Sequence, residues 1–484
     1  MPVAGLIILF AAFQQTSATA TLWGEAKTAL DHRDYAEARR LLSEAVRINP
    51  RDPALWFHLG VSYSELNQVD DAIGALEKAR GLAPDRAEVD FNLGLLYWKR
   101  GDVGKAKEAY RAGLALEPRQ PGALQNYALL LMKTGESGKA IEPLLSLKNV
   151  PELALASRVS LIECYLKVAD LPAAQREVDE LLQSGLAPPA EQTSLAALLI
   201  QDNQPDLAEK VLRNSLRLDG NQAKAHAALG VLLMNSHRFE EAAHSLETAV
   251  RLEPDSAEFA MAFSDSLLRW NRATTLLVFL KSVAPKFEAL PEFQYKLALA
   301  YYGVQEYSNA IVTLENLLRT NPRRQDQIEY ILGNSYFVLG KFEQSEAALR
   351  KAIELNPKQP DYYEKLAILL RKEGPDRLED AILQLKRASE FAPSDPRLNL
   401  QLGLTYESAG DLPDAAGQLE KAVAADPAML PAHVALARIY FRLGKKPEGQ
   451  KEKAAITSLE EQRQRQRLEP GNAGKEAAVD NKMP

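Results

Sequence analysis

The first segment of this chain with residue types suited to chemistry is 135–140. It reads Gly-Glu-Ser-Gly-Lys-Ala and resembles a phosphate-binding loop. Such a loop needs a glycine six residues before the lysine and a Ser or Thr directly after it. Here Lys133 and Ala140 occupy those two places, and no strand is predicted before the segment. We therefore interpret the segment as a turn between helices.

The other candidates for catalysis or metal binding are equally weak. His226, His237 and His244 fall within one short stretch, but no HExxH pattern and no neighbouring cysteine accompanies them. The single cysteine, Cys164, is predicted to be a small buried hydrophobic residue. Adjacent carboxylates such as those at 70–71 are placed on turns or exposed helix starts, without partners for acid–base work. We predict no catalytic residue, no metal site and no cofactor.

The composition limits the classes of protein to consider. The chain has 484 residues, of which 46% are hydrophobic and 25% charged, as in average soluble proteins. Its 58 basic and 65 acidic side chains leave a net charge of −7, which offers no overall field for nucleic acid. A single cysteine excludes an intramolecular disulfide and any multi-cysteine metal site. We predict no nucleic-acid partner.

The N-terminal twenty residues look like a targeting segment. The run from Val3 to Phe13 carries no charge and is shorter than the roughly 20 residues that a membrane-spanning helix needs. Ala18-Thr19-Ala20 follows it as a small-x-small cleavage site. We predict a signal peptide at 1–20, export to the periplasm or outside the cell, and no membrane span in the mature chain. The alternative is an apolar helix that caps the fold of a cytoplasmic protein, because no Lys or Arg precedes the run.

One pattern recurs along most of the chain. Leu59-Gly60-x-x-Tyr63 returns 34 residues later as Leu93-Gly94-x-x-Tyr97, and again near the C-terminus as Leu402-Gly403-x-x-Tyr406. Small residues such as Ala72 and Ala79 follow each copy at constant offsets. A fixed period of this length indicates stacked copies of one structural unit.

The 34-residue pattern resembles the tetratricopeptide repeat, a helix-turn-helix unit. Apolar residues at positions 4, 7, 11 and 24 form one buried face, and small residues at positions 8, 20 and 27 let two helices approach closely. Proline at position 32 ends the second helix. The resemblance implies an all-α fold, a right-handed superhelical solenoid of stacked repeats. It covers residues 19 to about 463 and leaves no segment for a separate catalytic domain.

About thirteen units are predicted, and they are not equal. The unit at 257–290 is degenerate, because Leu276 replaces a small residue and Pro285 comes early. We interpret it as a joint between two halves. The predicted organisation is a signal peptide at 1–20, N-terminal repeats at 21–290, C-terminal repeats with a capping helix at 291–467, and a disordered tail at 468–484.

By resemblance to the family, the first helix of each unit lines an inner groove. Near the N-terminus the groove positions are apolar and aromatic, and position 6 carries a row of hydrogen-bonding side chains. That row predicts pairing with the main chain of an extended peptide, and the alternative is a polar position that is simply solvated. The residues predicted here are Phe57, His58, Phe91, Asn92, Leu95, Trp98, Asn126 and Met132.

Toward the C-terminus the same positions become charged. They predict recognition of an acidic segment or a carboxylate terminus, against the alternative of ordinary solvated charges. Nearby carboxylates such as Glu407 temper the field. The residues predicted here are Arg371, Lys372, Arg438 and Arg442.

The sequence thus favours a non-enzymatic scaffold that binds peptide or protein segments along the groove. An exported co-chaperone or envelope assembly factor is a narrower form of the same hypothesis. A transferase or hydrolase with an unrecognised groove site is the alternative from another class. Other proteins are the predicted partners.

Overall fold

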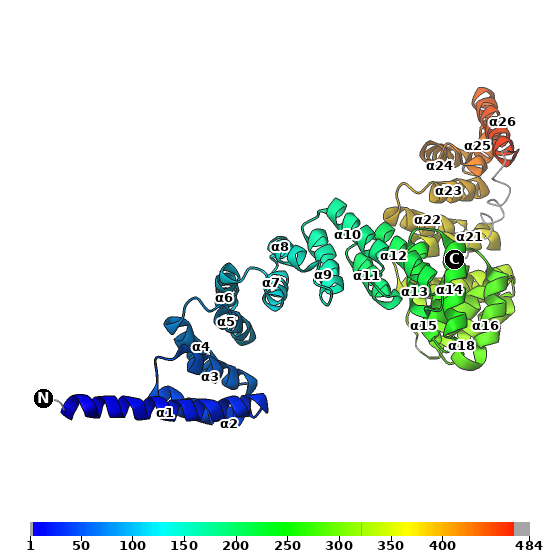
Figure 1. The fold of residues 1–484 in the computed structure, drawn as a ribbon. Coiled ribbons are helices and arrows are strands. Elements are labelled where there is room, and N and C mark those ends of the chain that lie inside the picture. The colour runs from blue at the N-terminus through cyan, green and yellow to red at the C-terminus, as the bar shows by residue number, and fades with distance from the viewer. Residues whose placement is uncertain (1–2, 321, 469–484) are drawn as a thin grey trace. The chain divides into compact units, whose positions relative to one another are not determined.

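The computed structural model describes residues 3–320 and 322–468, and within these ranges the chain folds into helices without any strand (Figure 1). None of the described helices combines the length and the apolar character needed to cross a membrane. The predicted tail at 468–484 lies outside the described residues, apart from residue 468, which ends the last helix.

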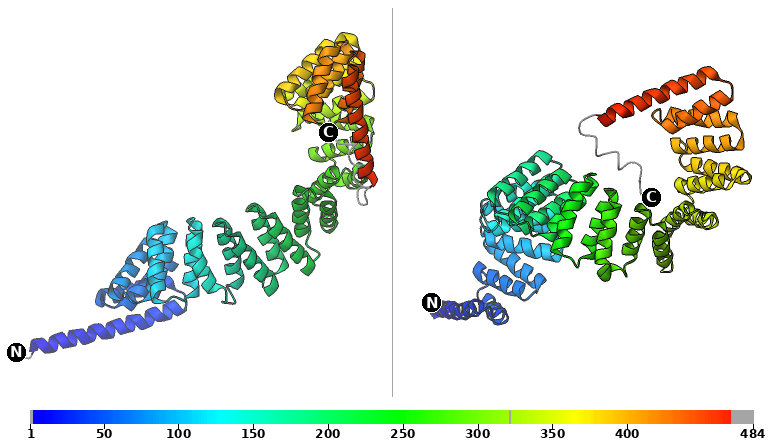
Figure 2. Two further views of the ribbon diagram at one scale, coloured as in Figure 1. Left: turned by 90° about the horizontal axis from the view of Figure 1, so that it is seen from above. Right: turned by 90° about the vertical axis from the view of Figure 1, so that its right-hand side faces the viewer.

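The chain divides into two compact units, Met1–Gly220 and Asn221–Pro484. In each unit, consecutive helices lie beside each other as antiparallel pairs, one pair to each repeat (Figures 1 and 2). These pairs confirm the predicted all-α solenoid of helix-turn-helix units. The predicted division of the repeats at residue 290 stays a prediction.

The first unit holds twelve helices among its described residues. They are α1 (Val3–Asp31), α2 (Tyr35–Ile48), α3 (Pro53–Glu65), α4 (Val69–Leu82), α5 (Ala87–Arg100), α6 (Val103–Leu116), α7 (Pro121–Lys133), α8 (Ser137–Leu147), α9 (Ala154–Lys167), α10 (Leu171–Ser184), α11 (Pro189–Gln201) and α12 (Pro205–Leu218).

The second unit continues the same alternation over its described residues. Its helices are α13 (Ala223–Asn235), α14 (Phe239–Leu252), α15 (Ala257–Arg269), α16 (Ala273–Phe287), α17 (Pro291–Gly303), α18 (Tyr307–Leu318), α19 (Gln325–Val338), α20 (Phe342–Leu355), α21 (Pro360–Glu373), the 3₁₀ turn η1 (Pro375–Arg377), α22 (Leu378–Phe391), α23 (Pro396–Ala409), α24 (Leu412–Ala425), α25 (Leu430–Arg442) and α26 (Lys446–Leu468).

Local sequence explains why each repeat turns where it does. A residue in the turn after the first helix adopts left-handed backbone, as Gly101 does at φ 88° and Asn67 at φ 61°. Gly and Asn tolerate that conformation best among the common residues. In some repeats an aspartate then caps the second helix, and the Asp102 side chain accepts a hydrogen bond from the Lys105 backbone N–H. Proline in the first turn starts many of the first helices, as at Pro53.

The two helices of a repeat touch through the small residues. A β-carbon on Gly60 would lie 2.6 Å from Leu76 Cγ, and one on Gly403 would lie 2.6 Å from Leu419 Cγ. Ala72 is fully buried in the same interface. The predicted close approach at these positions is confirmed.

Two repeats with irregular sequences still form helix pairs, and the structure shows where each irregularity lies. In the unit at 257–290, Leu276 is fully buried and Pro285 lies in the last turn of α16, so the helix pair still forms. In the unit that starts at Pro360, the lengthened turn is the 3₁₀ segment η1. The predicted capping helix is α26, and most of its described side chains are exposed.

The contacts of the glycines predict that a glycine-to-alanine substitution destabilises the repeat at Gly403 and stabilises it at Gly417. We expect Gly403→Ala to destabilise the α23–α24 repeat by about 1 kcal/mol, because Leu419 must shift to admit the new methyl group. We expect Gly417→Ala in α24 to stabilise the same repeat by about 0.5–1 kcal/mol, because nothing lies within 4 Å of the added carbon. Hydrogen exchange of the α23 and α24 amides measures both changes. Equal effects at the two sites would contradict the packing argument.

Candidate functional site

Two of the predicted aromatic residues in the first unit are held by contacts within the stack, one inside its own repeat and one with the next repeat. Phe91 in α5 packs on Gly113 of α6, where an added β-carbon would lie 2.5 Å from the Phe91 ring. The Arg86 guanidinium lies 5.2 Å from the centroid of the Phe57 ring in α3. Both phenylalanines therefore stabilise the stack, whatever else they contact.

The predicted polar row at position 6 is partly occupied by contacts within the chain. His58 lies 4.7 Å from Trp23 between ring centroids, and burial together with Arg86 lowers the pKa of His58. The Asn92 side chain donates a hydrogen bond to the Glu88 carbonyl one turn earlier in α5. Asn126 is half-buried in α7. Main-chain pairing by this row stays a prediction.

The most accessible apolar group among these predicted residues is Leu95, whose exposed fraction is 44%. Trp98, one turn further along α5, and Met132 in α7 are half-buried against the core of the first unit. Cys164 in α9 is fully buried, and burial raises the pKa of its thiol to about 12. This burial confirms that Cys164 packs as a small hydrophobic residue.

In the second unit, two of the predicted arginines are paired within the chain. Arg438 donates to both carboxylate oxygens of Glu407, with Nε 2.8 Å from Oε1. Arg442 donates to Glu407 Oε1 at 3.1 Å. The Glu407 side chain is only 13% exposed, so the two arginines offset the cost of burying its charge.

The other two predicted cations, Arg371 and Lys372, have no such counter-charge among the residues that the structure describes. Arg371 in α21 donates to Gln401 Oε1 at 3.0 Å and to the Thr405 hydroxyl at 3.2 Å, and both partners are neutral. Lys372 lies over the Phe337 ring at 4.9 Å. Burial lowers the pKa of Arg371.

Lys365 lies two turns before Lys372 on the same face of α21, and its ammonium also lacks a counter-charge within the described residues. Its ammonium lies 5.0 Å from the Phe337 centroid, and within the described residues it has no hydrogen bond and no ion pair. Burial lowers its pKa, which the charge of Glu364 offsets only in part. Asn334, one turn before Phe337 in α19, is 2% exposed, and its Oδ1 has no hydrogen-bond partner among the described residues. Most buried polar atoms in native proteins have a hydrogen-bond partner, so the unpaired Asn334 Oδ1 and Lys365 ammonium are exceptions in this part of the second unit.

Beside this region lies a group of tyrosines that the sequence analysis did not select. We call Tyr295 of α17, Tyr330 of α19 and Tyr362 of α21 the tyrosine cluster. The Tyr330 and Tyr362 rings are 4.9 Å apart between centroids, and all three tyrosines line one pocket of about 250 Å³. Tyr295 and Tyr330 stand at position 5 of their repeats, the position that Phe57 and Phe91 occupy in theirs, so the same spacing in the middle repeats points to both.

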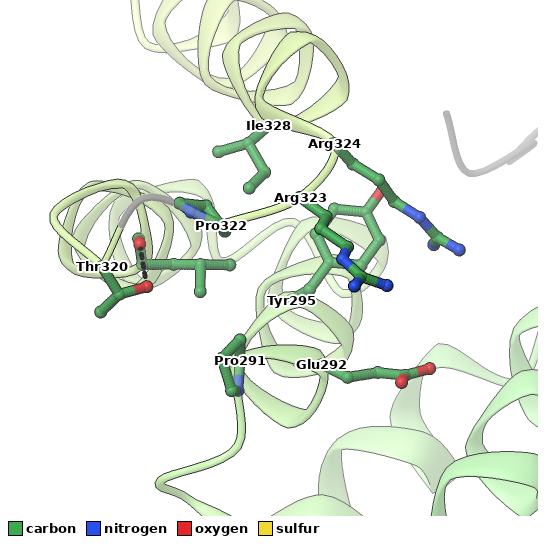
Figure 3. Close-up of a pocket in the computed structure, with 9 residues that line it drawn as sticks. Pro291, Glu292, Tyr295, Thr320, Pro322, Arg323, Arg324 and Ile328 are labelled. Carbon is green, nitrogen blue, oxygen red and sulfur yellow. Dashed lines mark hydrogen bonds between the residues drawn. The ribbon is translucent and has the colours of Figure 1, made fainter.

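Tyr295 also lines a second pocket of about 420 Å³ (Figure 3). Pro291, Pro322 and Ile328 form an apolar wall, and the charged ends of Glu292 and Arg324 point to the opposite side. The pocket therefore offers both an apolar and a charged surface to a ligand.

A stack of helix pairs with its open groups on the first helices defines a helical repeat protein. Sequence models of the tetratricopeptide repeat match residues 29–91, 91–154, 199–263, 292–323, 333–374 and 400–458. The chain belongs to the tetratricopeptide repeat family.

Two curated relatives and one solved structure illustrate the similarity. The chain is 27% identical to cellulose synthase operon protein C of Pseudomonas fluorescens, over 52% of this chain and 18% of the relative. It is 23% identical to superkiller protein 3 of Schizosaccharomyces pombe, over 54% of this chain and 20% of the relative. The match therefore spans about a fifth of the length of these relatives. The structure of Naa15/Naa10 bound to HypK-THB is 14% identical with a TM-score of 0.42, covering 91% of this chain and 75% of that one.

The packing of the first unit predicts that alanine substitution at Phe91 and at Leu95 changes the stability of the repeat by different amounts. We expect Phe91→Ala to destabilise the α5–α6 repeat by about 2 kcal/mol, because it leaves a cavity against Gly113. We expect Leu95→Ala in the same helix to cost less than about 0.5 kcal/mol, because its side chain is largely exposed. Thermal unfolding and hydrogen exchange of α5 measure both. A costly Leu95→Ala would place that side chain in the core instead.

Proposed function

We propose that this protein is a non-enzymatic scaffold that binds peptide or protein segments along the first helices of its repeats. Tetratricopeptide repeats of this kind typically serve protein–protein interaction, and the matched family models cover much of the chain. One observation carries the proposal. The Lys365 ammonium of α21 lies over the Phe337 ring of the preceding repeat, half-buried, and has no hydrogen bond and no ion pair within the described residues.

A protein segment would supply the missing partner of this ammonium. A carboxylate of the segment would accept a hydrogen bond from Lys365. The half-buried Phe337 ring beneath the ammonium would contact the apolar part of the segment. An ion pair of this kind gains strength where water is excluded, and the lowered pKa of Lys365 is consistent with such exclusion.

Because the Lys365 ammonium has no counter-charge within the described residues, replacing it should weaken peptide binding without lowering the stability of the fold. We expect Lys365→Met to weaken peptide binding about tenfold, the loss of a charge-assisted hydrogen bond. The melting temperature should stay equal or rise, because methionine keeps the contact with Phe337 and removes a desolvated charge. A library of random twelve-residue peptides, bound to the full chain, measures the affinity.

The matched control is Lys281→Met. Its ammonium also lies over a ring, 5.3 Å from the Tyr301 centroid, but the side chain is exposed. We expect this variant to bind as the unchanged chain does. Equal binding by the two variants would contradict the assignment to Lys365, and no peptide binding by the unchanged chain would contradict the scaffold.

We also propose that the protein is exported and that its signal peptide is removed. The uncharged run from Val3 to Phe13 and the small residues Ala18 and Ala20 support this proposal. An exported co-chaperone or envelope assembly factor is the narrower function that fits such a location.

Export predicts a mature chain that begins at Thr21. Mass spectrometry of the protein purified from the organism that encodes it measures the N-terminus. Replacing Ala18 and Ala20 with Gln should block removal and leave the longer chain, because the cleavage site requires small residues. A native protein that still begins at Met1 or Pro2 would overturn the proposal.

A further inference from the structure

The pocket that contains the tyrosine cluster has a composition that nothing described so far explains. It lies within the second unit, between α17, α19 and α21, and has a volume of about 250 Å³. Its lining combines three tyrosine rings with two carboxylates and with neutral groups, and it includes neither lysine nor arginine. The lining residues are Tyr295, Asp326, Gln327, Tyr330, Ile331, Asn356, Gln359, Asp361 and Tyr362.

The first carboxylate of the pocket keeps its charge without a cation. Asp326 Oδ2 accepts hydrogen bonds from the Asn356 amide and the Tyr362 hydroxyl, each at 2.9 Å. These bonds hold the pKa of Asp326 below its usual range although burial opposes them. Both donors are neutral, and no ion pair to Asp326 forms within the described residues. The pocket therefore has a negative charge that is ordered and not neutralised.

The second carboxylate is only partly neutralised. Asp361 is 3.1 Å from an Arg397 nitrogen, but the same guanidinium also pairs with Asp395 at 2.8 Å and approaches Glu364 at 3.7 Å. One arginine thus serves three carboxylates, and the region around Asp361 stays negative.

The aromatic rings favour the same kind of ligand. A cation placed near the face of a tyrosine ring is attracted by the quadrupole of that ring, and the attraction grows where water is excluded. Tyr330 and Tyr295 are both half-buried, and burial raises the pKa of each phenol. Arg324 lies 5.9 Å from the Tyr295 centroid, but it lines the adjoining pocket rather than this one. The tyrosine pocket itself has no cation of its own among the described residues.

We propose that the tyrosine pocket receives the cationic side chain, a lysine or an arginine, of a protein segment bound along α17, α19 and α21. This inference rests on the proposed function and names the chemistry of its partner. The charge complementarity extends along the same helices. Lys365 and Lys372, both over the Phe337 ring, select an acidic side chain within a few residues of the basic one. The partner is therefore a segment of mixed charge.

Random twelve-residue peptides displayed on an array test the proposal with the full chain. The quantity measured is the enrichment of Lys and Arg among bound peptides over their share in the library. We expect the unchanged chain to enrich basic residues. Asp326→Asn keeps the shape of the side chain and one oxygen that can accept from Asn356 and Tyr362, but removes the charge. Tyr330→Leu removes the ring but keeps apolar volume. We expect each to lower the affinity for the selected basic peptides by roughly five- to thirtyfold.

Three control variants locate the effect. Asp206→Asn changes the net charge equally at an exposed position of α12, and it should leave the enrichment unchanged. Tyr330→Phe keeps the ring and should retain the preference, which assigns the effect to the ring and not to the hydroxyl. If Tyr330→Leu fails to fold by circular dichroism, Asp326→Asn carries the test of the pocket. Lys365→Met should reduce the enrichment of acidic residues and leave that of basic residues in place.

The outcomes separate this inference from the function on which it rests. If the unchanged chain binds peptides without preferring Lys or Arg, the pocket proposal is overturned and the scaffold stands. A preference that survives both Asp326→Asn and Tyr330→Leu also overturns it, because the cation is then bound elsewhere. If the unchanged chain binds no peptide at all, the scaffold itself fails and the inference fails with it.

Discussion

Several repeats depend on the contact between a glycine on the first helix and a large residue on the second. Gly60 against Leu76, Gly230 against Leu246 and Gly333 against Leu349 repeat this contact, each with a distance near 2.5 Å to any added β-carbon. Close approach buries a continuous row of leucine and alanine side chains between the helices, and that burial stabilises the stack. Within each compact unit a repeat contacts chiefly its neighbours in the stack.

The positively charged side chains on the first helices fall into two groups, those paired with carboxylates and those without such a partner among the described residues. Arg438 and Arg442 are used by Glu407, and Arg397 is shared by three carboxylates, so these arginines hold neighbouring repeats together. Lys365 and Arg371 are desolvated, and neither has a carboxylate partner at hydrogen-bonding distance within the described part of the chain. Desolvated charge costs stability unless a partner offsets it, and the proposed ligand would supply that partner. The same distinction separates Phe91, which fills space beside Gly113, from the exposed Leu95.

In the second unit, a negatively charged pocket and two lysines lie near each other on the helices α17, α19 and α21. The tyrosine cluster and Asp326 make one end of the α17–α21 region attractive to a cation, and Lys365 with Lys372 makes the adjoining part attractive to an anion. A ligand of mixed charge matches both at once, and a ligand of the wrong order meets repulsion at each end. Specificity in such a groove therefore arises as much from mismatched charge as from attraction.

The sequence by itself determined the helix-turn-helix repeat, its boundaries and its small-residue contacts. These depend on local spacing: Gly60 stands sixteen residues before Leu76, Gly101 stands in the turn, and Asp102 caps the next helix. It also pointed to the first helices, but Tyr295 and Tyr330 were not among the predicted groove residues. Only the tertiary structure decided which charges are free, because Glu407 and Arg438 are 31 residues apart and Asp326 and Tyr362 are 36. Pairing between repeats depends on how side chains meet across the stack, and the pattern within one repeat does not contain that information.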